Sequence, residues 1–101
     1  MMKIDKITEG KTVTIKPEGW LDTVSSPELG EAVDTVTEAE KLVLDFDKVE
    51  YMASAGLRQV VAAHKKAQSL GAGFSVINVC PDVYSIFKMT GIFRKMDVKE
   101  K

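Results

Sequence analysis

The sequence predicts a single α/β domain in which a mixed, mostly parallel β-sheet carries an N-terminal hairpin and packed helices. Its 101 residues are enough for one compact domain spanning residues 1–101. Short apolar segments alternate with longer segments of helical periodicity along the chain. Three helical segments separate the later strands, and right-handed crossovers make strands connected in this way largely parallel.

A β-hairpin is expected at the start of the chain. Ile4 and Ile7 belong to its first strand, and residues 8–11 form the turn. Apolar and polar residues alternate over residues 12–16, which is typical of a half-buried strand. The second strand is expected to end at residues 17–19, because proline and glycine both interrupt regular structure.

A first helix and a central strand follow. Ser25 and Ser26 precede Pro27 and mark a helix start, from which helical spacing of apolar residues continues to about Thr37. Residues 41–46 are apolar on both faces, which indicates a central strand that is covered on both sides.

The second half of the chain repeats the alternation of helix and strand. A second helix follows residues 51–58 and extends to Leu70, with a broad apolar arc formed by Leu57, Val60, Val61, His64 and Ala67. Residues 74–79 form a buried strand. A third helix runs from Pro81 to Gly91, and residues 94–98 are expected to form a last edge strand.

Composition excludes several functional classes. The net charge is -1, from 14 basic and 15 acidic residues, and gives no electrostatic footprint for nucleic acid or an anionic membrane. Cys80 is the only cysteine, so neither an internal disulfide nor a CxxC pair can form. The early charges of residues 1–6 argue against a signal peptide, and no apolar run approaches the roughly 20 residues of a membrane helix. A cytoplasmic location is expected.

The most informative segment is Tyr51-Met52-Ala53-Ser54-Ala55-Gly56-Leu57-Arg58, where a strand gives way to a helix. A serine at this place can cap free backbone N–H groups of the helix. The same hydroxyl can also carry a phosphate, whose charge a helix N-terminus favours. The residues alone leave both roles open for Ser54.

Four local patterns resemble the STAS-domain anti-sigma factor antagonists. Gly19-Trp20-Leu21-Asp22 is similar to that family's Gly-x-Leu-Asp entry to the first helix, and Leu42-Val43-Leu44-Asp45-Phe46 to its central strand. Ser54-Ala55-Gly56-Leu57 stands at the phosphoacceptor loop. Thr90-Gly91-Ile92-Phe93 resembles the closing Thr-Gly-Leu segment. The four patterns follow one another in the order and with the spacing of that family, and together they span most of the chain.

This resemblance implies a partner switch. The unphosphorylated protein would bind an anti-sigma factor, a serine/threonine kinase related to histidine kinases, and so free a sigma factor. The kinase would then phosphorylate Ser54 with ATP and release the antagonist, and a phosphatase would reset it. The resemblance places partner binding on Asp22, Thr23, Ser25, Ser26, Met52, Ala53, Ala55, Gly56, Leu57 and Arg58. It implies no cofactor, metal, direct nucleic-acid contact or membrane contact.

Two residues depart from the family pattern. Ala53 stands where aspartate is frequent, and Ala55 stands where serine is frequent. Loss of the carboxylate at position 53 removes like-charge repulsion from a phosphate on Ser54, but it also removes a group that the kinase could recognise. A STAS module that senses a ligand or acts as a scaffold without phosphorylation is therefore the main alternative.

A small hydrolase or transferase with Ser54 as nucleophile is a weaker alternative. His64 is the only histidine, and ten residues of helix place it roughly 15 Å from Ser54, beyond hydrogen-bond reach. We expect His64 to be packed or half-buried. Asp22 and Asp45 either brace loops or line the site, and Trp20 is either a contact residue or a hydrophobic plug over the sheet edge.

Overall fold

The computed structural model describes residues 3–101, apart from the side chain of Phe93; Met1 and Met2, part of the segment that argues against a signal peptide, lie outside it. The described chain forms one mixed sheet with three α-helices, which confirms the predicted fold class. In chain order the elements are β1 (Lys3–Glu9), β2 (Thr12–Leu21), α1 (Ser26–Asp34), β3 (Lys41–Asp45), β4 (Lys48–Met52), α2 (Ser54–Ser69), β5 (Gly73–Val79), α3 (Pro81–Thr90), the 3-10 helix η1 (Ile92–Arg94) and β6 (Asp97–Glu100).

The sheet is built around the long strand β2. Its strand order is β1-β2-β3-β5-β6, and β4 also pairs with β2. β1 and β2 are antiparallel and form the predicted hairpin, whereas the other pairings in residues 3–101 are parallel. The first half of β2 pairs with β3 (Thr12–Ile15), and the second half pairs with β4 (Glu18–Leu21). Because of this division, β2 and β4 both end at the same edge of the sheet.

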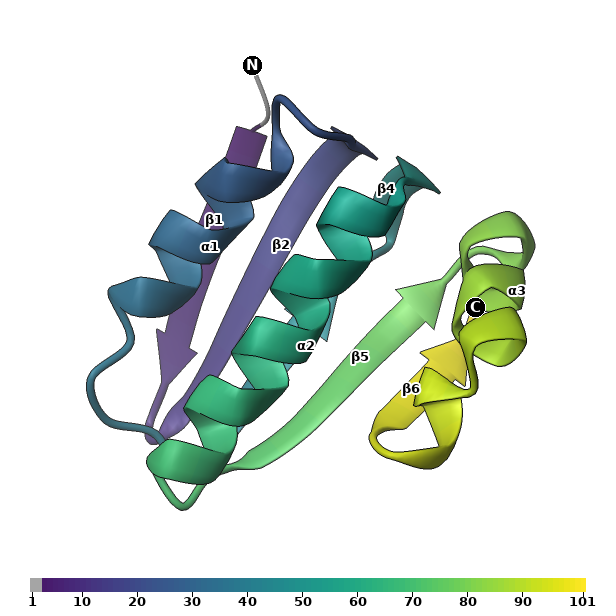
Figure 1. Cartoon of the computed structure of the whole chain (residues 1–101). Coiled ribbons are helices and arrows are strands. Elements are labelled where there is room, and N and C mark those ends of the chain that lie inside the picture. Colours follow the sequence, from purple (N-terminus) through teal and green to yellow (C-terminus); the bar gives the residue numbers. More distant parts are fainter. Residues whose placement is uncertain (1–2) are drawn as a thin grey trace.

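Helices α1 and α2 lie side by side against one face of the sheet (Figure 1). They approach closely at Gly30, where an added Cβ would lie 2.4 Å from Gln59 Oε1. The core lies between the sheet and its helices, and α3 contributes Val83 and Phe87 to it. Its largest fully buried side chains include Phe46, Phe87, Ile15, Leu21 and Leu29.

Several predicted boundaries were wrong. β2 does not end at residues 17–19 but continues through Pro17. Pro17 lies between the residues that pair with β3 and those that pair with β4, so no backbone N–H is needed there for a hydrogen bond to either strand. α1 ends at Asp34 rather than Thr37, since the Thr35 hydroxyl donates to the Ala32 carbonyl and a β-branched run follows. β6 begins at Asp97, because η1 occupies part of the segment predicted as strand.

The core-facing side of α2 matches the predicted apolar arc only in part, since Val60 and Ala67 of that arc are buried as expected. Its buried residues are Gly56, Val60, Ala63 and Ala67. Leu57, Val61 and His64, which belong to the predicted arc, are only half-buried. Gly56 and Ala63 are small, so the face of α2 that carries them packs closely on the rest of the protein. The edge of the apolar arc formed by Leu57, Val61 and His64 therefore remains at the surface.

Candidate functional site

Two loops that are far apart in the sequence meet at the sheet edge where β2 and β4 end. In the parallel pairing Trp20 lies opposite Tyr51 and Leu21 lies opposite Met52. Beyond Met52, the Ala53 N–H donates to the Leu21 carbonyl over 2.8 Å. The turn after β2 and the start of α2 are therefore neighbours. We call residues 22–26 and 52–58 the switch loops.

Ser54 is the first residue of α2 and is exposed to solvent. The helix cap is Ala53, which has an extended backbone and makes no side-chain cap hydrogen bond. Of the two roles left open for Ser54, the cap role is therefore ruled out, since the cap position falls on Ala53. The Ala53 carbonyl instead accepts the N–H groups of Gly56 (2.9 Å) and Leu57 (3.1 Å). No acidic residue lies in the first turn of α2, so the helix itself places no carboxylate beside Ser54 at the positive end of its dipole.

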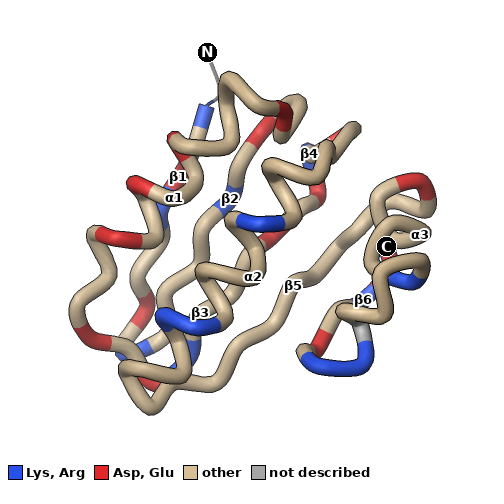
Figure 2. Tube along the Cα trace, viewed as in Figure 1, with Lys and Arg blue, Asp and Glu red and all other residues tan. Residues whose placement is uncertain are grey.

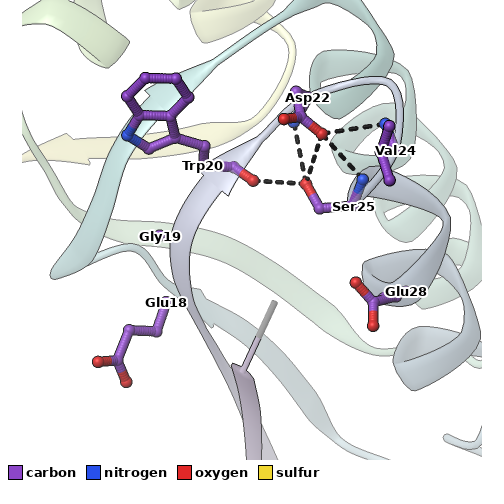
Figure 3. A pocket seen from close by; sticks show the side chains of 7 residues that line it. All are labelled: Glu18, Gly19, Trp20, Asp22, Val24, Ser25 and Glu28. Carbon is purple, nitrogen blue, oxygen red and sulfur yellow. Dashed lines mark hydrogen bonds between the residues drawn. The ribbon is translucent and has the colours of Figure 1, made fainter. Parts of the chain in front are cut away.

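Asp22 organises the other switch loop (Figure 3). Its Oδ1 accepts the backbone N–H groups of Val24 (3.0 Å) and Ser25 (2.9 Å). The Ser25 hydroxyl lies 3.0 Å from the same oxygen, accepts the Asp22 N–H at 3.1 Å, and contacts the Trp20 carbonyl. These hydrogen bonds, chiefly the one from the Ser25 backbone, lower the pKa of Asp22 below its ordinary value. The prediction that Asp22 braces this turn is confirmed.

The helix-start role predicted for Ser25 and Ser26 is also confirmed. Ser25 occupies the cap position of α1, and Ser26 is the first helical residue. Both are buried, whereas Thr23 and Val24 at the tip of the turn are exposed. The side chains that this loop offers to a partner are therefore those of its tip.

A shallow acidic hollow lies beside the Asp22 turn. It has a volume of about 200 Å³ and is lined by Glu18, Gly19, Trp20, Asp22, Val24, Ser25 and Glu28, whose arrangement Figure 3 shows. Small-molecule pockets usually enclose about 300–1,000 Å³ and are mainly apolar. A hollow with three carboxylates is better suited to a basic side chain of a protein partner than to an anion.

An exposed aromatic pair borders the switch loops. Trp20 is 60% exposed and Tyr51 is 47% exposed, and their ring centroids are 5.5 Å apart in a tilted arrangement. The hydrophobic plug considered for Trp20 was therefore wrong. Successive strand residues point to opposite faces, so the pair lies on the face opposite Leu21 and Met52. Sequence patterning did not mark Tyr51 as a surface residue, because β4 was not predicted.

The Ser54 loop rests on a tightly packed base. Gly56 is buried, and a Cβ added there would lie 2.8 Å from both Leu21 Cβ and Met52 Cγ. Met52 is 1% exposed, so it supports the loop from below, and its side chain cannot make the partner contact that the resemblance placed on it. Ala55 and Leu57 are half-buried, while Arg58 is exposed. Ser54 and Arg58 thus give this loop its accessible polar groups.

The remaining sequence candidates lie elsewhere. His64 is half-buried, as predicted, with its ring 5.2 Å from that of Phe74. Asp45 braces its own loop, since its Oδ1 accepts the Asp47 N–H and an Asn78 side-chain N–H. Within residues 3–101 no cluster of three or more histidine, cysteine or acidic residues has a geometry that could hold a metal ion. Over the same residues no helix has both the length and the apolar character required to cross a bilayer.

Comparison with known proteins identifies the family. The STAS domain model matches residues 3–101, and the chain belongs to the STAS domain family. The fold is similar to that of an anti-sigma factor antagonist from Mycobacterium paratuberculosis, with 21% identity and a TM-score of 0.89 over 100% of this chain and 87% of that one.

Two further structures widen the comparison. The Bacillus cell fate determinant SpoIIAA in its phosphorylated form has 17% identity and a TM-score of 0.73, over 97% of this chain and 90% of that one. A sulfate transporter family protein from Wolinella succinogenes has 13% identity and a TM-score of 0.80, over 94% and 81%. At these identities the similarity shows a shared fold.

Proposed function

We propose that this protein is an anti-sigma factor antagonist whose unphosphorylated form binds an anti-sigma factor serine kinase and is released when Ser54 is phosphorylated. One observation carries the proposal: an exposed serine hydroxyl heads α2, directly beside the hydrogen-bonded Asp22 turn. Family membership supports it, as does the fold shared with an anti-sigma factor antagonist and with a phosphorylated SpoIIAA.

The local electrostatics suit a reversible phosphate. A phosphoserine adds about -1.5 to -2 charges at neutral pH. The N-terminus of α2 stabilises this charge within the protein, and Ala53 adds no carboxylate to repel it. In a docked complex the same charge meets the partner's surface. About 1.4 kcal/mol of unfavourable interaction there weakens binding tenfold, so one phosphate is sufficient to release the partner.

The partner surface in this proposal consists of the exposed parts of the switch loops. Thr23, Val24, Ser54 and Arg58 offer side chains directly, and Leu57 is partly accessible. Ser25, Ser26, Met52 and Gly56 hold those residues in place from below. A kinase bound here would have the Ser54 hydroxyl within the interface, as its substrate. The protein itself would carry out no catalysis, and a phosphatase would restore the binding form in the cytoplasm.

A STAS module that works without phosphorylation is the second candidate. Ala53 in place of the frequent aspartate favours it, because a kinase could depend on that carboxylate. The fold shared with a sulfate transporter family protein also shows that this architecture occurs outside the antagonists. A serine hydrolase has less support: Ser54 makes no hydrogen bond to a base in residues 3–101, and His64 lies along α2 against Phe74.

Intact-mass spectrometry after incubation with ATP and the cognate anti-sigma factor kinase tests the proposal. The wild type should gain one phosphate, and Ser54→Ala should gain none. Ser85→Ala is the matched control, since Ser85 is another exposed helical serine whose hydroxyl donates only to the Asp82 carbonyl. It should be phosphorylated like the wild type. An unmodified wild type that still forms the complex would support the second candidate, and loss of both modification and complex would refute the partner switch.

A further inference from the structure

The apolar edge of α2 that the core leaves uncovered forms one wall of a groove. Two adjoining hollows of about 500 and 360 Å³ share Val61, Lys65 and Ile92. Besides the small, exposed Ala62, the apolar residues of the groove are Leu57 and Val61 from α2, Ile92 from η1 and Met96 after it. All four side chains are half-buried, so they are recessed between α2 and η1 instead of projecting into solvent.

The rim of this groove is basic. Arg58, Lys65 and Lys95 line it, each exposed, and no aspartate or glutamate is among its lining residues. Figure 2 shows the contrast between the two neighbouring helices: blue segments lie on α2, whereas red segments lie on α1 and the loop after it, and the chain after α3 carries blue segments with red beside them. Although the net charge is only -1, basic and acidic residues are therefore separated on this face of the molecule.

The dimensions of the groove fit a short helix. Its α2 wall extends from Leu57 to Gln68, which at 1.5 Å per residue is roughly 16 Å, or about three helical turns. An amphipathic helix presents apolar side chains at i, i+3, i+4 and i+7 over such a length. Acidic residues beside that stripe would then meet the rim cations.

We infer that the groove between α2 and η1 docks an acidic amphipathic helix of a protein partner. This inference goes beyond the switch at Ser54, because it requires neither phosphorylation nor the exposed aromatic pair. The groove does begin at Leu57 and Arg58 in the switch loops, so one partner can span both surfaces. A partner helix here adds specificity through charge while its apolar stripe supplies most of the affinity.

Other occupants fit less well. A membrane surface would engage projecting apolar side chains, but the large exposed ones in the described chain lie outside the groove: Ile7, Trp20, Val24, Tyr51 and Met89. A second copy could offer its acidic helix α1. The exposed positions of that helix, however, are charged or prolyl, at Pro27, Glu31 and Asp34, and provide no apolar stripe to fill the groove.

Fluorescence anisotropy with a synthetic peptide tests the inference. The probe is a labelled amphipathic peptide of about 14 residues, with leucines at i, i+3, i+4 and i+7 and glutamates flanking them. It should bind the full-length protein saturably, and Lys65→Glu combined with Lys95→Glu should weaken binding about tenfold or more. The control is Lys41→Glu with Lys48→Glu, which makes the same charge change at exposed lysines outside the groove and should bind like the wild type.

The inference would be overturned by no saturable binding of the glutamate peptide, by equal binding of a lysine-flanked version, or by peptide-induced amide NMR shifts that lie outside α2 and residues 92–96. Co-sedimentation with phosphatidylcholine–phosphatidylglycerol vesicles in place of peptide binding would also overturn it, and would assign the groove to a lipid surface. Phosphorylation of Ser54 in the groove variant remains a separate readout, so failure of the switch and failure of the groove are distinguishable.

Discussion

The packing beneath Ser54 predicts opposite effects for two Gly→Ala substitutions. Both Gly56 and Gly30 lie inside helices and neither has a positive φ. Helix propensity alone should therefore make each alanine stabilising by up to about 1 kcal/mol. What differs is the space available to the new methyl group. At Gly56 the neighbours are two buried side chains and the Leu21 carbonyl oxygen, the last at 3.0 Å.

These neighbours of Gly56 cannot give way easily. Leu21 and Met52 are 0% and 1% exposed, and the carbonyl belongs to a strand whose end holds Ala53. Overpacking of this kind costs about 1–3 kcal/mol, and the close contact with backbone places it at roughly 2–3. After subtraction of the propensity gain, Gly56→Ala should lower the free energy of unfolding by about 1–2 kcal/mol. For a domain of this size the midpoint should fall by roughly 4–16 °C.

Gly30→Ala is the matched comparison. The three atoms nearest to its new methyl group all belong to the side-chain amide of Gln59, which can rotate away. This variant should be as stable as the wild type or more stable, by up to about 1 kcal/mol. Thermal unfolding followed by circular dichroism, with urea titration as a second measure, compares the three proteins. If Gly56→Ala were as stable as Gly30→Ala, the proposed tight packing of α2 on β2 would be refuted.

Two further predictions concern the switch loops. The pKa of Asp22 is lowered in the folded protein. Its ionised form therefore stabilises the folded state at pH values above the ordinary pKa of about 3.9, and this stabilisation is lost as the pH falls through the folded pKa. Asp22→Asn should therefore lower the free energy of unfolding at neutral pH, and its difference from the wild type should disappear in acid. Urea unfolding at several pH values measures this difference, and a difference that did not change with pH would refute the reasoning. Val24→Ala should weaken partner binding with little loss of stability, because Val24 is 84% exposed at the tip of the Asp22 turn, while Ile7→Ala, at an exposed apolar site on β1, should leave binding unchanged. Isothermal titration calorimetry and thermal unfolding separate these effects, and equal losses of affinity would contradict a specific role for Val24.

The sequence predicted the order of most elements but missed β4. Strand periodicity is the usual sign, and a bulge disrupts it here: Glu50 has no partner between the Gly19–Val49 and Trp20–Tyr51 pairs. Val49 and Met52 are buried, with two exposed residues between them, so no alternation is visible. Gly19, with φ at +108°, adopts on β2 a backbone conformation that other residues rarely accept. In a segment of only five residues with this burial pattern, periodicity does not indicate a strand.

That missed strand explains why the two switch loops lie together. The family resemblance placed Asp22 and Ser54 on one partner-binding face, but nothing in their sequence spacing implies that the two loops are in contact. The contact follows from β2 being long enough to pair with β3 first and β4 afterwards, so that β2 and β4 end at the same edge and the Ala53 N–H reaches the Leu21 carbonyl. The same pairing places Tyr51 against Trp20 and packs Gly56 on Leu21. The candidate site is thus a consequence of parallel strand pairing, and disruption of the β2–β4 register should separate Ser54 from the Asp22 turn even with every site residue present.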